Sequence, residues 1–229
     1  MNHKALLEEE IKKFDYNNGK IRLTFGVLVV VVLCTFLIVI ATFTKLSFID
    51  SSLPVEALKH PTVYMEQTGI GLWEFLCSYK YIPQIPVIIF ISALIGPHFG
   101  FISVLLYVLI GLFSVPVFAI GGGWKYIFEH NFGYILAFMP AVLVAGKILS
   151  KQLTLKNALK ASFFSVLLIH FIGIMYTAII IILNRSGFNY FMEMIVVQNG
   201  IKIIFDLVFS VLAVLVARPV KHILWLAMS

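Results

Sequence analysis

The sequence predicts an all-α integral membrane protein with six transmembrane helices. Of its 229 residues, 61% are hydrophobic and 12% are charged, and the mean hydropathy is +1.01. A soluble domain of this size needs far more polar surface. Several apolar stretches, beginning with residues 23–44, are long enough to cross a bilayer. Composition and run length therefore give the same fold class.

The spans are taken in order from these apolar runs. Residues 1–22 are polar, with charges of both signs, and we expect them to form a short helix on the cytoplasmic surface. A transmembrane domain over residues 23–217 and a cytoplasmic tail over residues 218–229 should follow. The second and third runs are short for a full crossing, and Gly96-Pro97-His98 joins them as a tight turn. The predicted spans are residues 23–44, 82–95, 99–113, 132–149, 159–183 and 194–217.

The distribution of basic residues sets the predicted orientation, because cytoplasmic loops are rich in Lys and Arg. One side holds Lys4, Lys12, Lys13, Lys20, Arg22, Lys147, Lys151, Lys156, Lys160, Arg218 and Lys221. The other side holds Lys45, Lys59, Lys80, Lys125 and Arg185. We therefore expect both termini in the cytoplasm. The net charge of +6, which could indicate nucleic-acid binding in a soluble protein, reflects these loops.

Two segments on the predicted outer side could contribute to a site. The loop over residues 45–81 carries Trp73 in a stretch that resembles an interfacial helix, and it is either a lid over a cavity or an inert surface insertion. The run Gly121-Gly122-Gly123 before Lys125 lets the backbone approach a ligand closely and expose its N–H groups, although a flexible turn explains it equally well.

The last span contains an unusual polar face. Lys202 and Asp206 are the charged residues within 194–217, and each costs about 2.5–3.5 kcal/mol near the centre of a membrane helix. Helical spacing places Asn199, Lys202 and Asp206 on one face, with Lys202 able to pair with Asp206. We interpret this face, in the outer half of the span, as a candidate binding site. The alternative is a structural ion pair at a helix contact.

Residues 83–149 contain a proline pair, a turn, a long apolar motif, the glycine run and a Gly-Tyr motif, namely Pro83, Pro86-Val87, 94–100, 103–118, 121–123 and 131–138. In this order they resemble the BioY biotin-transporter family, the substrate-capture subunits of energy-coupling-factor transporters. It implies a six-helix protein that binds biotin or a related vitamin, in partnership with an energising transmembrane subunit and its ATPases.

The resemblance also implies which residues bind the vitamin. Lys202 matches the lysine of the last helix, and Asn199 stands where the family has an acidic residue that bonds the ureido ring. An amide offers one acceptor and two donors to a cyclic urea. Lys125 matches a basic residue after the glycine loop and could meet the biotin carboxylate, leaving open which lysine does so. The substrate-binding candidates are Lys202, Asn199, Lys125, Gly122, Gly123, Tyr134 and Asp206.

Docking on an energising subunit is less clearly indicated. The family uses an Ala-xxx-Ala motif on its first helix, and residues 23–44 lack one. The same spacing occurs at Ala141/Ala145 and Ala213/Ala217, although most pairs of this kind serve close packing within the molecule. The sequence therefore also allows a transporter that works without an energising subunit.

Three functional hypotheses follow. The first is a vitamin-capture membrane subunit without enzymatic activity or cofactor, energised by a separate ATPase because the chain lacks a phosphate-binding loop motif. The second is a proton-coupled secondary transporter of a small anionic solute that uses Lys202, Asp206 and His170. The third, a membrane enzyme, is disfavoured because the sequence contains neither His-Glu-x-x-His nor Gly-x-Ser-x-Gly.

Overall fold

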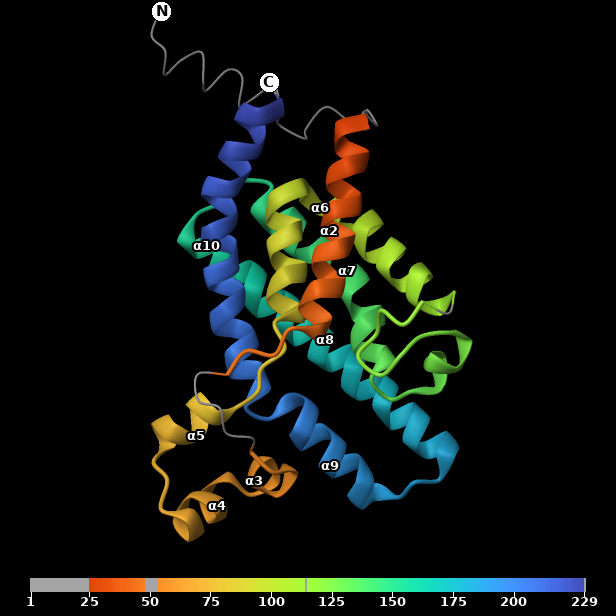
Figure 1. Ribbon diagram of the computed structural model, residues 1–229, viewed down its shortest axis with the longest axis vertical. Coiled ribbons are helices and arrows are strands. Elements are labelled where there is room, and N and C mark those ends of the chain that lie inside the picture. The colour runs from red at the N-terminus through yellow and green to blue at the C-terminus, as the bar shows by residue number, and fades with distance from the viewer. Residues whose placement is uncertain (1–24, 48–52, 114, 229) are drawn as a thin grey trace, which may run out of the picture.

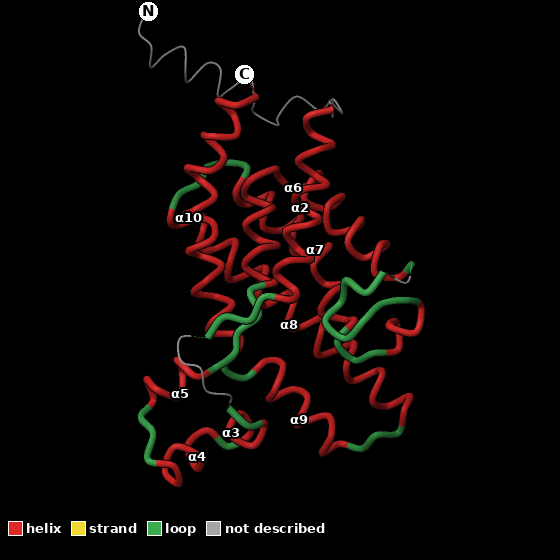
Figure 2. The backbone as a smooth tube through the Cα atoms, viewed as in Figure 1, coloured by secondary structure: helices red, strands yellow, loops and turns green. Residues whose placement is uncertain are grey.

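The computed structural model describes residues 25–47, 53–113 and 115–228 (Figure 1). The expected surface helix over residues 1–22 lies outside this range. Within it, every regular element is helical, as Figure 2 shows, and the extended pairing is limited to two isolated bridges. The prediction of an all-α chain is confirmed for the described residues.

The described part of the chain contains five long helices and several short ones. The long ones are α2 (Phe25–Phe43), α6 (Gln84–Leu112), α7 (Phe132–Leu149), α8 (Leu155–Asn184) and α10 (Lys202–Met228). The short ones are α3 (Val55–Lys59), α4 (Pro61–Thr68), α5 (Leu72–Ser78), α9 (Phe188–Asn199) and the 3-10 turn η2 (Trp124–Phe128). Among the described residues, five helical segments are long and apolar enough to cross a membrane, the last of them Phe188–Lys221.

Helix α6 folds back on itself and accounts for two of the predicted spans. Gly96 interrupts it with φ 79° and ψ 179°, in a region that glycine alone adopts readily. The Gln84 Nε2 amide donates a hydrogen bond of 2.9 Å to the Tyr107 hydroxyl, although 23 residues of straight helix would span roughly 34 Å. The predicted turn at Gly96-Pro97-His98 therefore exists, and it joins two antiparallel limbs.

Buried hydroxyl groups attach α2 to the second limb of α6. Thr35 Oγ1 donates to the backbone carbonyl of Ser103 at 3.1 Å, and Ser103 Oγ donates to that of Val31 at 3.2 Å. At Thr42, the residue before the last of α2, Oγ1 accepts a 2.7 Å bond from Gln84 at the start of the first limb of α6. These three hydroxyl groups are thus paired inside the bundle, as a membrane interior favours.

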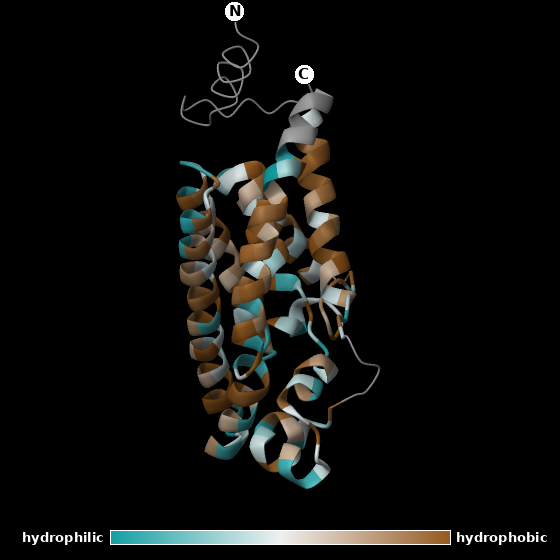
Figure 3. Cartoon of the chain, turned by 90° about the vertical axis from the view of Figure 1, so that its left-hand side faces the viewer, coloured by the Kyte–Doolittle hydropathy of each residue, from teal (hydrophilic) through white to brown (hydrophobic). Residues whose placement is uncertain are grey.

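The outer surface of the bundle is apolar. On α2, Phe25, Leu33, Phe36 and Ile40 are all at least 60% exposed. Hydrophobic residues dominate the long helices in Figure 3, whereas the short helices at the end away from the C-terminus mix hydrophobic and hydrophilic residues. Exposed apolar surface on this scale fits contact with lipid. The chain is a multi-pass membrane protein.

The small-residue pair on α7 faces inward. Ala141 and Ala145 are both fully buried, and the adjacent Gly146 lies so close to Pro97 that an added Cβ would approach its ring to 2.7 Å. Ser92 of α6 also donates a 2.7 Å bond to the carbonyl of Val142. This pair is therefore packed inside the bundle, which is one of the two explanations that the sequence left open.

The connections fall at two ends of the molecule. Figure 1 places the beginning of α2, the α6 turn, the α7–α8 connection and the end of α10 at one end. The α3–α5 segment (residues 53–81) and the α8–α9 connection lie at the other, and the stretch over 115–131 lies at the side of the bundle towards that end. Lys59 of the α3–α5 segment forms a 3.1 Å ion pair with Glu193 of α9, so this segment is attached to the bundle.

Candidate functional site

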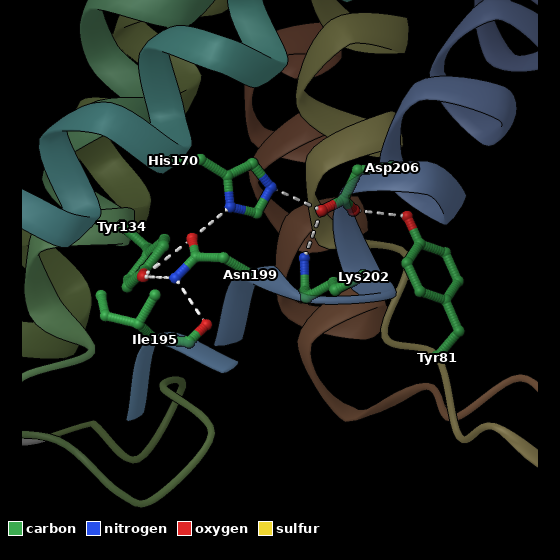
Figure 4. A network of polar contacts seen from close by, with 7 residues as sticks. All are labelled: Tyr81, Tyr134, His170, Ile195, Asn199, Lys202 and Asp206. Carbon is green, nitrogen blue, oxygen red and sulfur yellow. Dashed lines mark hydrogen bonds and ion pairs between the residues drawn. The ribbon is translucent and has the colours of Figure 1, made fainter. Parts of the chain in front are cut away.

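The polar residues of the last predicted span belong to two helices. The prediction that one continuous helix carries Asn199, Lys202 and Asp206 is wrong. Helix α9 ends at Asn199 and α10 begins at Lys202, with Gly200 between them at φ −43° and ψ −109°. A Cβ on Gly200 would lie 2.5 Å from the carbonyl oxygen of Val196, so glycine permits this break. The three side chains nevertheless meet in one network (Figure 4).

Asp206 is the centre of the network. Its side chain is fully buried, and its carboxylate accepts three hydrogen bonds from three different parts of the chain. Lys202 Nζ lies 2.7 Å from Oδ2, His170 Nε2 lies 3.0 Å from Oδ2, and the Tyr81 hydroxyl donates to Oδ1 at 2.7 Å. A buried charge requires such compensation, because removal from water disfavours it strongly.

His170 of α8 joins the two halves of the site. Its imidazole is 2% exposed. Nδ1 lies 2.6 Å from Asn199 Oδ1 at the end of α9, while Nε2 lies against Asp206 in α10. One ring therefore bridges the two helices across the break at Gly200.

Asn199 is held by α7 as well. The Tyr134 hydroxyl lies 3.1 Å from Oδ1 and 2.8 Å from Nδ2, while Nδ2 also donates to the Ile195 carbonyl at 3.1 Å. The Tyr134 ring lies directly over Gly173 of α8, where an added Cβ would come within 2.3 Å of it. The absent side chain at Gly173 thus makes the space in which Tyr134 reaches Asn199.

Tyr81 connects the α3–α5 segment to the site. Its backbone pairs with Leu46 at the end of α2, and its ring stacks on Phe205 and Phe209 of α10 at centroid distances of 5.5 and 5.1 Å. Burial, followed by the neighbouring Asp206 carboxylate, raises the pKa of the Tyr81 phenol well above its usual value. The hydroxyl consequently stays protonated and donates to Asp206.

Lys202 is the most accessible charged group of the network. Its side chain is 19% exposed, and its ammonium lies 5.8 Å from the centroid of the Tyr81 ring. The contact with Asp206 uses one of its three donors. Lys202 is therefore oriented by Asp206 and Tyr81 and retains donor capacity for an anionic ligand.

The glycine run and Lys125 lie apart from this network. In the described part of the chain, no resolved interaction joins Gly122, Gly123 or Lys125 to its members. The Gly121 N–H donates to Phe118 and the Gly123 N–H to Gly111, so the loop closes on itself. Lys125 is exposed on η2. Whether these three residues bind a ligand stays a prediction.

The structure thus unites four of the seven sequence candidates and adds two residues. Asn199, Lys202, Asp206 and Tyr134 meet, together with His170, which the sequence offered as a relay residue, and Tyr81, which it did not offer. Tyr81 is 125 positions from Asp206 in the chain, and no local pattern reveals that pairing. The described residues contain no cluster of three side chains that could hold a metal ion.

Comparison with known proteins places the chain in a family. The model of the BioY family matches residues 80–225, which contain the whole six-residue network. The chain belongs to the BioY family. The matched range includes Asn199, where the resemblance implies an acidic residue.

Two curated BioY relatives match part of the chain. A probable biotin transporter BioY of Lysinibacillus sphaericus is 32% identical over 108 residues, which are 45% of this chain and 55% of the relative. Its counterpart in Pyrococcus horikoshii is 34% identical over 104 residues, 45% of this chain and 61% of the relative. The chain thus matches less than two thirds of the length of either relative.

A solved structure shares the fold. The crystal structure of an S-component for biotin from an ECF-type ABC transporter superposes with a TM-score of 0.61 at 19% identity, covering 88% of this chain and 95% of that one. The similarity therefore extends beyond the segment that the curated BioY relatives match, into the fold of nearly the whole chain.

Proposed function

We propose that this protein is a membrane-embedded biotin-capture subunit, with a pocket open to the outside, that is energised by a separate ATPase module. The BioY family assignment and the two relatives named as probable biotin transporters support the substrate. The fold shared with an S-component supports the role of a capture subunit.

The observation that carries the proposal is the composition of the buried network. It combines one carboxylate, Asp206, with the ammonium of Lys202 and the imidazole of His170 in a largely buried site. Such a network favours an anionic ligand over a cationic one, because a second buried cation would meet repulsion. Biotin carries a carboxylate, and Lys202 is the donor that we assign to it.

The ureido ring is assigned to the region of Asn199. Its amide already bonds to His170, Tyr134 and Ile195. Contact with the ring therefore requires that the ligand replace one of these partners or bind beside them through the Tyr134 hydroxyl. Lys125, Gly122 and Gly123 are assigned to the opposite edge of the pocket.

Six membrane crossings with both termini in the cytoplasm complete the proposal. The two limbs of α6 supply the additional crossing beyond the five apolar segments. The α7–α8 connection lies at the end of the bundle where α2 begins and α10 ends. The connection and the adjoining turns of α7 and α8 contain Lys147, Lys151, Lys156 and Lys160, which supports a cytoplasmic assignment for that end.

Thermal unfolding of the purified full chain in detergent tests the function. A ligand that binds the native state stabilises it and so raises the melting temperature. At a ligand concentration of a hundred times Kd, the free energy of unfolding increases by about 2.7 kcal/mol. We expect a rise with biotin, loss of that rise in Lys202→Ala, and no change in the exposed control Lys151→Ala. Lys125→Ala separates the two candidate lysines. Absence of a shift with biotin and with other vitamins would refute the proposal.

A proton-coupled secondary transporter is the second candidate. The observation in its favour is the continuous chain of hydrogen bonds from Tyr134 through Asn199 and His170 to Asp206. Uptake by vesicles that contain this chain alone, and that collapses with the proton gradient, would support it. Uptake that requires an added ATPase module and persists without a gradient would support the capture subunit.

A further inference from the structure

Both ring nitrogens of His170 face oxygen atoms that act as acceptors. On the Asp206 side, Oδ2 is a carboxylate oxygen that also receives the Lys202 ammonium. On the other side, the orientation of the Asn199 amide is set by Ile195, because a backbone carbonyl accepts only from the amide NH₂. Asn199 therefore presents its oxygen, not its nitrogen, to Nδ1 at 2.6 Å.

A neutral imidazole cannot satisfy both contacts. It has one N–H and one lone pair, and the lone pair would face an oxygen lone pair at 2.6 or 3.0 Å. Transfer of a proton to Asp206 would relieve the contact at Nε2, but it would place that proton on a carboxylate held by the Lys202 ammonium and the Tyr81 hydroxyl. The doubly protonated imidazolium has an N–H donor at each ring nitrogen and so forms a hydrogen bond at both contacts.

We propose that His170 is an imidazolium in this site and that binding of an anionic vitamin depends on that proton. The inference deepens the proposed function and rests on it. His170 acts as a positioning residue: it holds Asn199 and Asp206 across the break between α9 and α10, and its charge sets the net charge that the ligand meets.

The charges around His170 define this dependence. From α10, His170 faces Asp206, whose carboxylate also bonds to Lys202 and to the Tyr81 hydroxyl. From α7 it faces the Tyr134 ring, with the ring centroids 6.0 Å apart. From α9 it faces the uncharged Asn199. With His170 charged, these groups sum to one positive charge, which a ligand carboxylate neutralises. With His170 neutral, the bound ligand would leave one uncompensated negative charge in a buried site.

The affinity for biotin should therefore fall as the pH rises. Between about pH 5.5 and 9, the carboxylic acid of biotin stays ionised and lysine stays protonated, so a change of charge within the six-residue network would have to come from its histidine. The protonated form binds the anion, and by linkage the Kd should rise by up to about tenfold per pH unit once His170 loses its proton. The uncharged biotin amide can bind with a different affinity, but its Kd should not change with pH.

Two variants of the full chain complete the test, with Kd measured by isothermal titration calorimetry across this range. His170→Gln keeps a polar side chain without a titrating charge, and its biotin affinity should be weaker at low pH and independent of pH. Asn199→Asp places a carboxylate next to Nδ1 in addition to Asp206 at Nε2. The added carboxylate favours the imidazolium, so the loss of affinity should move to higher pH, while the added negative charge weakens the affinity for biotin at every pH. If His170→Gln does not fold, the pH profile of Asn199→Asp is sufficient to test the inference.

The outcomes separate this inference from the proposed function. Biotin binding that is equally tight across the range, or an Asn199→Asp profile that moves to lower pH or stays in place, would overturn the role of His170 and leave biotin capture intact. Absence of biotin binding at every pH would instead refute the proposed function. An equal pH dependence for biotin and its amide would also overturn the inference, because the ligand charge would then play no part.

Discussion

At the scale of single residues, Asp206 explains why the polar groups of the site lie where they do. A carboxylate with no exposed surface needs several donors, and here α10 supplies Lys202, α8 supplies His170 and the stretch before α6 supplies Tyr81. Asn199 provides the link from this cluster to α7. The pairing of Lys202 with Asp206 was predicted from helical spacing, while the other donors come from distant parts of the chain.

Tyr81→Phe should destabilise the fold by removing one hydrogen bond to the buried carboxylate. A bond to a charged group contributes about 1.5–3 kcal/mol, and the stacking of the ring on Phe205 and Phe209 is retained. Tyr79→Phe is the matched control, since Tyr79 also stacks on Phe205, at 5.2 Å, without a bond to Asp206.

Unfolding of both variants in denaturant, in the same detergent, measures the difference. The free energy of unfolding should fall in Tyr81→Phe and change by less than about 0.5 kcal/mol in Tyr79→Phe. Equal effects of the two substitutions would show that the hydroxyl of Tyr81 is not the important group.

At the scale of helices, glycine positions decide how closely the elements approach the site. The break at Gly200 turns α10 away from α9 and lets side chains from both helices meet at His170. Gly173 lets the Tyr134 ring lie against α8. The geometry of the network thus depends on backbone positions that carry no functional group.

Gly173→Ala should damage the site through packing alone. The new Cβ would lie 2.3 Å from the Tyr134 ring, which must move and so loosen its contact with Asn199. Overpacking of this kind costs about 1–3 kcal/mol. Gly71→Ala is the control, because Gly71 has open space around it and φ −77°.

Biotin-dependent thermal shifts of the two variants provide the comparison. Gly173→Ala should lower the melting temperature and weaken the shift, and Gly71→Ala should leave both unchanged. A Gly173→Ala protein with the normal melting temperature and the normal biotin response would contradict the close approach of Tyr134 and α8.

At the scale of the whole molecule, the structure separates two ends that the membrane should place in different compartments. Lys151 lies in the α7–α8 connection at one end, and Glu66 lies in α4 at the other (Figure 1). Both side chains are exposed, and the two native cysteines, Cys34 and Cys77, are buried.

Cysteine labelling in intact cells tests the proposed orientation. A membrane-impermeant maleimide should label Glu66→Cys before lysis and Lys151→Cys after lysis, while the parent chain stays unlabelled because its thiols are buried. The reverse pattern would place both chain termini outside the cell and would overturn the orientation derived from the basic residues.

The sequence by itself determined the membrane class, the positions of the apolar segments, the turn at Gly96 and the identity of Lys202 and Asp206 as significant residues. These follow from local properties, namely hydrophobicity over a run, the restricted backbone of glycine and proline, and the cost of charge in lipid. The tertiary structure alone decided that α10 begins at Lys202, that His170 bridges Asn199 and Asp206, and that Tyr81 completes the network. Those contacts join residues up to 125 positions apart, so they depend on how the helices pack and not on any pattern along the chain.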